Sequence, residues 1–142
     1  METQELHRGR LIDHIQLVVQ DLPASQKFYT AIFDALDIPI GGSGESFFWV
    51  DELFVSTRDS DAAQGELTGR HHLAFQARDE AMVDAFYKAA LEYGGKDNGK
   101  PGKRPYHPGY YAAFVLDPDG NNIEAVYHGM AKRSAPSVTI VF

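Results

Sequence analysis

The sequence contains no cysteine among its 142 residues. This absence excludes disulfide bonds, thiolate metal sites and a cysteine nucleophile. Any bound metal must therefore be held by nitrogen and oxygen ligands, which histidine, aspartate and glutamate side chains supply. The absence also fits a reducing compartment.

Long apolar runs are absent as well. No stretch approaches the roughly 18 consecutive apolar residues that a membrane span needs. The N-terminal segment METQELHRGR is charged where a secretory signal would have an apolar core. We therefore expect a cytoplasmic protein without a membrane partner.

Basic residues are few. Lysine and arginine number 13 against 20 aspartates and glutamates, which gives a formal net charge of -7. The basic clusters are short ones, at Lys100, Lys103 and Arg104 and at Lys132 and Arg133. A nucleic-acid binder needs an extended basic surface, so we expect no nucleic-acid partner and favour a small-molecule ligand.

An internal repeat is the most informative feature that is present. When the chain is aligned with itself at an offset of 58 residues, matching residues hold register without a gap. The clearest matches are His14 with His72, Asp21 with Asp79, and Phe28-Tyr29 with Phe86-Tyr87. Such a run indicates two homologous modules. The length and the 44% hydrophobic content suit one domain with a sizeable core.

Each copy of the repeat predicts the same order of elements. A short apolar run (LIDHIQLVV or RHHLAFQA) predicts a strand, and apolar residues at helical spacing follow it. The helical positions expected to be buried are Phe28, Ile32, Ala35 and Leu36 in the first copy, and Val83, Phe86, Tyr87, Ala90 and Leu91 in the second. Later strands are predicted at SFFWV, ELFVST, YYAAFVL and NNIEAVY.

One module therefore has the order β-α-β-β-β. The first is expected at about 11–57 and the second at about 70–128, with a polar connection at 58–69 and a turn at Asp117–Gly120. We expect a single domain over 11–129, with terminal extensions at 1–10 and 130–142. The segment SVTIVF in the last extension could add an edge strand or dock against a partner chain.

Two such modules cannot bury their sheet faces alone, so together they predict an α+β fold in which a curved mixed sheet forms a cleft. Side chains alternate along a strand, so His14 shares a face with Gln16, and His72 occupies the equivalent position in the second copy. We expect these two histidines to converge in the cleft.

Glu124 is the third candidate in the cleft, because it lies in the apolar strand after the Asp117–Gly120 turn. A buried carboxylate needs a partner, and a cation would supply one. Two imidazoles and one carboxylate form a facial set that binds a divalent metal and leaves coordination positions open.

These segments resemble the vicinal oxygen chelate superfamily, which includes glyoxalases, bleomycin resistance proteins and extradiol dioxygenases. The resemblance covers roughly 11–128 and is carried by Asp13-His14, by His72-Leu-Ala-Phe75 and by Asp117-Pro-Asp-Gly-Asn-Asn-Ile-Glu124. It is closest to an uncharacterised glyoxalase-like branch. The resemblance implies the same fold, a homodimer and a divalent metal (iron, manganese, zinc or nickel) held by His14, His72 and Glu124.

Two departures from the family pattern bear on the reaction. A glyoxalase I has a fourth ligand at the position of Phe54, if Leu53-Phe54 corresponds to Ile123-Glu124. Glu52 is two residues away and a weak substitute. An extradiol dioxygenase has a tyrosine where Phe114 stands, although Tyr110 shares the parity of Phe114 along the strand.

Three functions stay open at this point. In the first, a metal-dependent lyase or isomerase chelates a small substrate through vicinal oxygens, and His107 or Tyr110 moves a proton. In the second, the same triad holds iron in a ring-cleaving dioxygenase. In the third, a metal-free binding or resistance protein sequesters a ligand in a cleft lined by aromatic residues such as Trp49 and Phe54. Lys103 and Arg104 could bind an acidic substrate at the cleft mouth.

Overall fold

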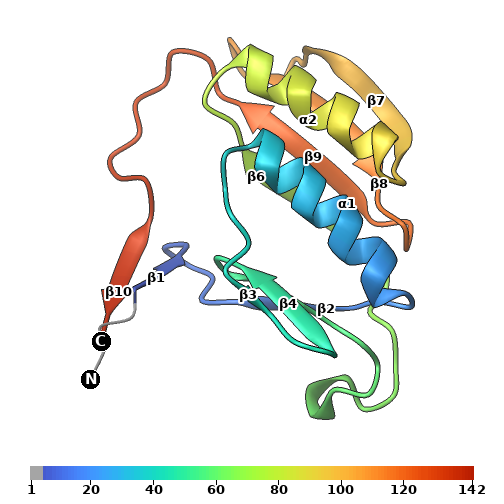
Figure 1. The fold of residues 1–142 in the computed structure, drawn as a ribbon. Coiled ribbons are helices and arrows are strands. Elements are labelled where there is room, and N and C mark those ends of the chain that lie inside the picture. Colours follow the sequence, from blue (N-terminus) through green and yellow to red (C-terminus); the bar gives the residue numbers. More distant parts are fainter. Residues whose placement is uncertain (1–4) are drawn as a thin grey trace. The chain divides into compact units, whose positions relative to one another are not determined.

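The computed structural model describes residues 5–142 (Figure 1). Residues 1–4 of the predicted N-terminal extension lie outside the described residues. The elements in chain order are β1 (Glu5–Arg8), β2 (Ile15–Val18), α1 (Leu22–Ala35), β3 (Gly42–Ser43), β4 (Phe47–Val50), β5 (Leu53–Ser56), the short 3-10 helix η1 (Asp61–Ala63), β6 (His72–Gln76), α2 (Glu80–Glu92), β7 (Lys96–Lys103), β8 (Tyr111–Leu116), β9 (Asn122–Tyr127) and β10 (Val138–Val141).

The predicted repeat of elements is confirmed. One copy reads β2-α1-β3-β4-β5 and the other reads β6-α2-β7-β8-β9. Each copy forms a four-stranded sheet, with the spatial order β2-β5-β4-β3 in one and β6-β9-β8-β7 in the other. In both sheets the first strand pairs in parallel with the last, and the remaining pairs are antiparallel. The fold is therefore the α+β class that the sequence predicted.

The chain divides into two compact units, which are described separately. Residues 5–22, 40–68 and 132–142 belong to the first unit, and residues 23–39 and 69–131 belong to the second. Apart from its first residue, helix α1 is part of the second unit, although its sequence comes from the first copy of the repeat.

The first unit contains the β2-β5-β4-β3 sheet and a separate two-stranded ribbon of β1 and β10. Alternation along its strands buries one set of apolar side chains. These are Leu17, Phe48, Val50, Leu53 and Val55, each no more than 5% exposed. In the ribbon, Leu6 lies opposite Ile140 in an antiparallel register.

The second unit contains the β6-β9-β8-β7 sheet, and both helices lie along one face of it (Figure 1). The Phe33 ring of α1 contacts the Phe75 ring of β6 at 4.8 Å between centroids. Strand residues of the same parity, Val115, Ile123 and Ala125, are fully buried. The other face of this sheet, which turns away from the helices, carries His72, Phe114 and Glu124.

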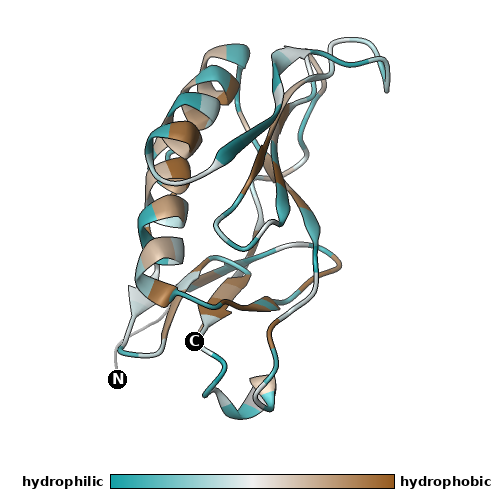
Figure 2. Ribbon diagram, turned by 90° about the vertical axis from the view of Figure 1, so that its right-hand side faces the viewer, coloured by the Kyte–Doolittle hydropathy of each residue, from teal (hydrophilic) through white to brown (hydrophobic). Residues whose placement is uncertain are grey.

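The helices form where the apolar spacing predicted them, and Figure 2 shows hydrophobic and hydrophilic bands alternating along them. Helix α2 begins after Asp79, whose side chain accepts a hydrogen bond from the Met82 backbone N–H at 2.8 Å. The predicted core positions Phe28, Ile32, Leu36, Val83, Phe86 and Ala90 are buried. The prediction for Leu91 is wrong: it is 40% exposed, because it lies on the outer face of the last turn.

The strand registers confirm the alignment of the two modules. Ile15 pairs with Leu53 and Gln16 with Phe54 in the first sheet. In the second sheet, Leu73 pairs with Ile123 and Ala74 with Glu124. Because the repeat places Gln16 on Ala74, Phe54 occupies the position that Glu124 holds in the other sheet.

Three features differ from the sequence prediction. Strand β2 covers only Ile15–Val18, so Asp13 and His14 precede it. The order of the second module predicts a strand directly after its helix, but the sequence did not show which residues form it; the structure places it at β7, in the glycine-containing segment KDNGKPGK. The C-terminal segment, for which an edge strand was one expectation, forms β10, but its partner is β1 rather than a strand of either four-stranded sheet. Among the described residues, none of the helices has both the length and the apolar character of a membrane span.

Candidate functional site

The second unit brings together a histidine, a glutamate and a tyrosine on the sheet face away from the helices. His72 Nε2 lies 2.9 Å from Glu124 Oε1. The Tyr110 hydroxyl donates a short hydrogen bond to the other carboxylate oxygen, Glu124 Oε2. The side chain of Glu124 is only 3% exposed, whereas that of His72 is 52% exposed. Both oxygens of a buried carboxylate are therefore partnered, and the histidine opens to solvent.

Burial of the phenol and its hydrogen bond to Glu124 raise the pKa of Tyr110 well above its usual range. The phenol thus stays protonated at neutral pH, where it is a hydrogen-bond donor to Glu124. Its hydroxyl fixes the orientation of the carboxylate, so Tyr110 is suited to positioning Glu124 rather than to accepting a proton.

Two further histidines lie against the ring of Tyr110. His107 Nε2 is 2.9 Å from His128 Nδ1, and His107 Nδ1 is 2.9 Å from the Pro108 carbonyl oxygen. A carbonyl can only accept, so His107 donates to it through Nδ1. In the neutral pair, His107 Nε2 then accepts from His128 Nδ1–H. The ring centroids of His107 and His128 lie 5.2 and 5.5 Å from that of Tyr110.

The turn before β9 fixes the strand that carries Glu124. Asp117, 4% exposed, accepts from the Asp119 and Asn121 backbone N–H groups and from the Asn121 side chain. The fully buried Tyr29 hydroxyl donates to Asp117 Oδ2 at 2.5 Å. Burial, followed by the Asp117 charge, raises the pKa of Tyr29 well above its usual range.

In the first unit, His14 is oriented by the residue before it. His14 Nδ1 lies 2.7 Å from Asp13 Oδ1. This hydrogen bond lowers the pKa of Asp13, with a smaller contribution from the Arg8 charge. The ionised Asp13 therefore accepts from Nδ1–H, which leaves the His14 Nε2 lone pair available as a metal ligand.

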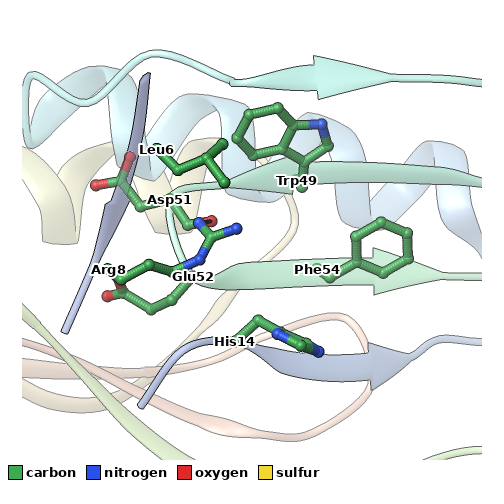
Figure 3. A pocket seen from close by; sticks show the side chains of 7 residues that line it. All are labelled: Leu6, Arg8, His14, Trp49, Asp51, Glu52 and Phe54. Atoms are coloured by element: carbon green, nitrogen blue, oxygen red, sulfur yellow. Dashed lines mark hydrogen bonds between the residues drawn. The ribbon is translucent and has the colours of Figure 1, made fainter. Parts of the chain in front are cut away.

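The same unit contains a pocket of about 320 Å³ in which His14 takes part. The rings of Trp49 and Phe54 lie at one side of it, and Arg8, Asp51 and Glu52 gather at the other (Figure 3). The volume is at the lower end of the range for small-molecule sites. Leu6 of the β1 ribbon completes the lining.

The charged side of this pocket has two carboxyl groups, those of Asp51 and Glu52, whose pKa values are raised. Arg8 donates to the Asp51 backbone carbonyl at 2.8 Å, rather than to its carboxylate. Burial raises the pKa of both Asp51 and Glu52, and the Asp51 charge raises that of Glu52 further. Asp51 also has a φ of 45°, in the turn between β4 and β5. Both carboxyl groups therefore favour protonation more than an ordinary surface carboxyl does.

In the second unit, the separation of His72 and Glu124 fits two neighbouring ligands of a divalent metal. Ligands at right angles on a metal about 2.1 Å away are about 3 Å apart, close to the 2.9 Å between His72 Nε2 and Glu124 Oε1. Ligating carboxylates and histidines usually have outer hydrogen-bond partners, as Tyr110 and Asp13 provide here. Within residues 5–142, no group of three or more His, Asp or Glu side chains is spaced to hold a metal by itself.

Of the five predicted site residues, the structure places His72, Glu124, Tyr110 and His107 in one cluster in the second unit. His14 belongs to the first unit. Sequence reasoning missed His128, for which the sequence offers no signal because its partner is 21 residues away. It also missed Asp13 as the partner of His14, although an acidic residue directly before a candidate ligand is a signal that could have been read.

Comparison with known proteins agrees with this architecture. Residues 39–125 match the family model of the Glyoxalase/Bleomycin resistance protein/Dioxygenase superfamily. A solved glyoxalase/bleomycin resistance protein from Albidiferax ferrireducens T118 is 30% identical, with a TM-score of 0.68 over 82% of this chain and 97% of that one. No curated protein sequence matches significantly.

Two other solved structures are similar in fold at 20% identity. A glyoxalase-related enzyme from Fulvimarina pelagi has a TM-score of 0.71 over 92% of this chain and 97% of that one. A lactoylglutathione lyase from Agrobacterium tumefaciens has a TM-score of 0.59 over 82% and 92%. The family match and the 30% identical structure define the class: this chain belongs to the glyoxalase/bleomycin resistance protein/dioxygenase superfamily.

Proposed function

We propose that this protein is a divalent-metal-dependent lyase or isomerase that acts on a small molecule chelated through vicinal oxygens. The observation that carries the proposal is the buried Glu124 carboxylate, which has Tyr110 on one oxygen and His72 on the other. A histidine and a carboxylate in this arrangement are two of the three ligands predicted from the sequence.

His14, His72 and Glu124 are the proposed ligands. His14 is included because the repeat makes it equivalent to His72 and because Asp13 holds its Nδ1, so that Nε2 can bind a metal. A divalent metal bound by such a set supplies Lewis acidity, which stabilises negative charge developing on the substrate oxygens.

The remaining groups of the cluster have separate roles in the proposal. Tyr110 holds the Glu124 carboxylate in its orientation and stays protonated. His107 is the proposed proton-transfer group, because an imidazole has both a donor and an acceptor nitrogen and the His107 Nε2 shares a hydrogen bond with His128. The pocket lined by Trp49 and Phe54 supports a small molecule as substrate.

The proposed reaction is related to that of glyoxalase I but differs in substrate. One structural neighbour is named lactoylglutathione lyase, and its 20% identity shows a common fold only. A glyoxalase I would have a carboxylate or amide where this chain has Phe54. We therefore propose a lyase or isomerase acting on a substrate other than a glutathione hemithioacetal.

A metal titration tests this function. Calorimetry of the metal-free protein with Ni²⁺, Zn²⁺ and Mn²⁺ should give one site per chain, and Glu124→Gln should weaken binding about 100-fold or more, because a neutral amide binds a divalent cation less tightly than a carboxylate does. Glu92→Gln, at the exposed end of α2, is the matched control. Equal metal affinity in Glu124→Gln and wild type would contradict the proposal.

The two alternatives make different predictions. A ring-cleaving dioxygenase would consume oxygen with catechols when loaded with Fe²⁺, but Phe114 provides no hydroxyl at the position where that branch has tyrosine. A metal-free binding protein is favoured by the aromatic side of the pocket. It would bind its ligand equally well after chelation and after Glu124→Ala.

We also propose that the protein is a homodimer, as the family resemblance implies. The chain mass is 15.8 kDa. Light scattering on the peak that elutes from a size-exclusion column should therefore report twice that mass. A mass equal to that of one chain, at the concentration used for metal titration, would contradict this part of the proposal.

A further inference from the structure

Arg104 occupies a fixed place beside the His72–Glu124–Tyr110 cluster. It directly follows β7, and its backbone N–H donates to the Tyr110 carbonyl at 2.9 Å. Its guanidinium carbon lies 5.3 Å from the centroid of the Phe114 ring, over the face of that ring. Phe114 is the register partner of Glu124. The guanidinium therefore lies on the sheet face that carries the proposed metal ligands.

Two backbone carbonyls hold the guanidinium in its plane. Arg104 Nη2 donates to the Lys100 carbonyl at 2.7 Å, and Nη1 donates to the Lys103 carbonyl at 3.3 Å. Glycines leave the space for this arrangement. A Cβ on Gly102 would lie 3.1 Å from Nη1, and one on Gly99 would lie 3.4 Å from Nη2. A side chain at either position would crowd the guanidinium.

The charge of Arg104 has no counter-ion in this arrangement. An arginine has five N–H donors, and the two carbonyls take two of them. In the described part of the chain, 5–142, no carboxylate lies within ion-pair distance of Arg104, whereas Arg8 and Arg78 pair with Asp13 and Asp37. A half-buried guanidinium that is held in place, stacked on an aromatic ring and without a carboxylate partner is suited to bind one.

The Phe114 ring links this cation to the proposed chelate site. The His72 ring lies 6.0 Å from the Phe114 ring between centroids, so both His72 and Arg104 contact the same ring. A ligand whose oxygens are near His72 and Glu124 would therefore lie beside the ring on which the Arg104 guanidinium is stacked.

We propose that the substrate carries a carboxylate, which Arg104 binds through its remaining N–H donors while the vicinal oxygens are held at the His72–Glu124 end. The inference rests on the proposed function, since it specifies the substrate class of that same site. A planar carboxylate suits the planar guanidinium fork, which a lysine ammonium cannot reproduce.

The test compares two chelating probes that differ only in the carboxylate. Catechol and 3,4-dihydroxybenzoate are titrated into the zinc-loaded protein, because zinc does not oxidise them. In wild type, 3,4-dihydroxybenzoate should bind about 10- to 100-fold more tightly than catechol, the range expected of charge-assisted hydrogen bonds. Arg104→Gln should remove this difference without changing catechol affinity, and Arg104→Lys should restore only part of it.

Arg78→Gln is the matched control, since it removes one positive charge from the same unit and should leave the preference intact. Equal affinities for the two probes in wild type, or an unchanged preference in Arg104→Gln, would overturn the inference while leaving the chelate site standing. Failure of wild type to bind either probe, although zinc is bound, would contradict the chelate site itself and the inference with it.

Discussion

The two four-stranded sheets have the same strand order and equivalent registers, but they carry different side chains at equivalent positions. In the second sheet, Glu124 is paired with Ala74, and its two carboxylate oxygens are hydrogen-bonded to His72 and Tyr110. The first sheet has Phe54 paired with Gln16, and Phe54 stacks on Phe47 at 5.3 Å. The two modules therefore share the backbone arrangement and one histidine each. The last strand carries a candidate metal ligand, Glu124, in one module and an aromatic side chain, Phe54, at the same place in the other.

The turns that precede these last strands differ in the same way. In the second sheet, Asp117 closes the turn through buried hydrogen bonds. In the first sheet, the turn residues Asp51 and Glu52 line a pocket, and burial raises the pKa of both carboxyl groups. The turn of the second sheet is thus held by buried hydrogen bonds, whereas the turn of the first sheet lines a pocket.

The largest effect on metal affinity is expected from a change at His72, the histidine of the second sheet. His72→Ala should weaken metal binding about 100-fold or more, because it removes a ligand and leaves Glu124 with only Tyr110. Calorimetry with Ni²⁺ measures this. His71→Ala removes the neighbouring imidazole as a control and should bind metal as wild type does. Equal losses in both variants would mean that the effect is not specific to the His72 position.

The next largest effect is on the stability of the turn that Asp117 closes in the second sheet. Tyr29→Phe should lower the free energy of unfolding by about 1 to 3 kcal/mol, because it leaves a buried Asp117 oxygen with one donor fewer. Urea denaturation measures the change. Tyr93→Phe, at a tyrosine that is 51% exposed, should change stability by much less. A Tyr29→Phe protein as stable as wild type would show that the turn does not depend on this hydroxyl.

Tyr110→Phe tests whether the Glu124 carboxylate depends on the Tyr110 hydroxyl. It should weaken metal binding about tenfold while leaving the fold intact, since the hydroxyl orients Glu124 without being a proposed ligand. Tyr106→Phe is the control, because this neighbouring tyrosine is 66% exposed. An unchanged metal affinity in Tyr110→Phe would indicate that Glu124 needs no such support.

The smallest effect is in the first sheet and depends on pH. A raised pKa in the folded state means that folding favours the protonated carboxyl. The contribution of Asp51 and Glu52 to the stability of the fold should therefore fall as the pH rises above about 4, the ordinary range of a carboxyl group. Glu52→Gln should reduce this fall by less than about 1 kcal/mol, since solvent screens the half-exposed group.

Thermal unfolding at pH 4 and pH 7 measures this difference. Glu66→Gln, an exposed acid in the same unit, serves as the control and should leave the pH dependence unchanged. A pH dependence in Glu52→Gln identical to that of wild type would remove the case for an unusual carboxyl at the pocket.

The repeat was enough to predict the fold. The offset of 58 residues placed the first strand and the helix of each module. Phe54 and Glu124 are 70 residues apart, so their alignment was a separate assumption about the last strand of each module, and the registers confirm it. Apolar spacing placed both helices, because a buried stripe repeats along a helix. These features depend on local pattern, which a single sequence contains.

The features that were missed depend on contacts between distant residues. Strand β7 has the sequence KDNGKPGK, whose composition is that of a loop, and its pairing with β8 overrides that composition through two register shifts. Strand β1 pairs with a strand about 130 residues further along the chain. The Arg104–Phe114 and His107–His128 contacts are likewise set by the folded sheet.

We propose that His14 and His72, the equivalent histidines of the two modules, both bind one metal. Elemental analysis of protein purified without a metal-binding tag tests it most directly, with wild type, His14→Ala and His72→Ala prepared side by side. We expect near-stoichiometric metal in wild type and loss of the metal in both variants. A wild type that stays metal-free after reconstitution with several divalent ions, or a His14→Ala protein that keeps its metal, would contradict the account.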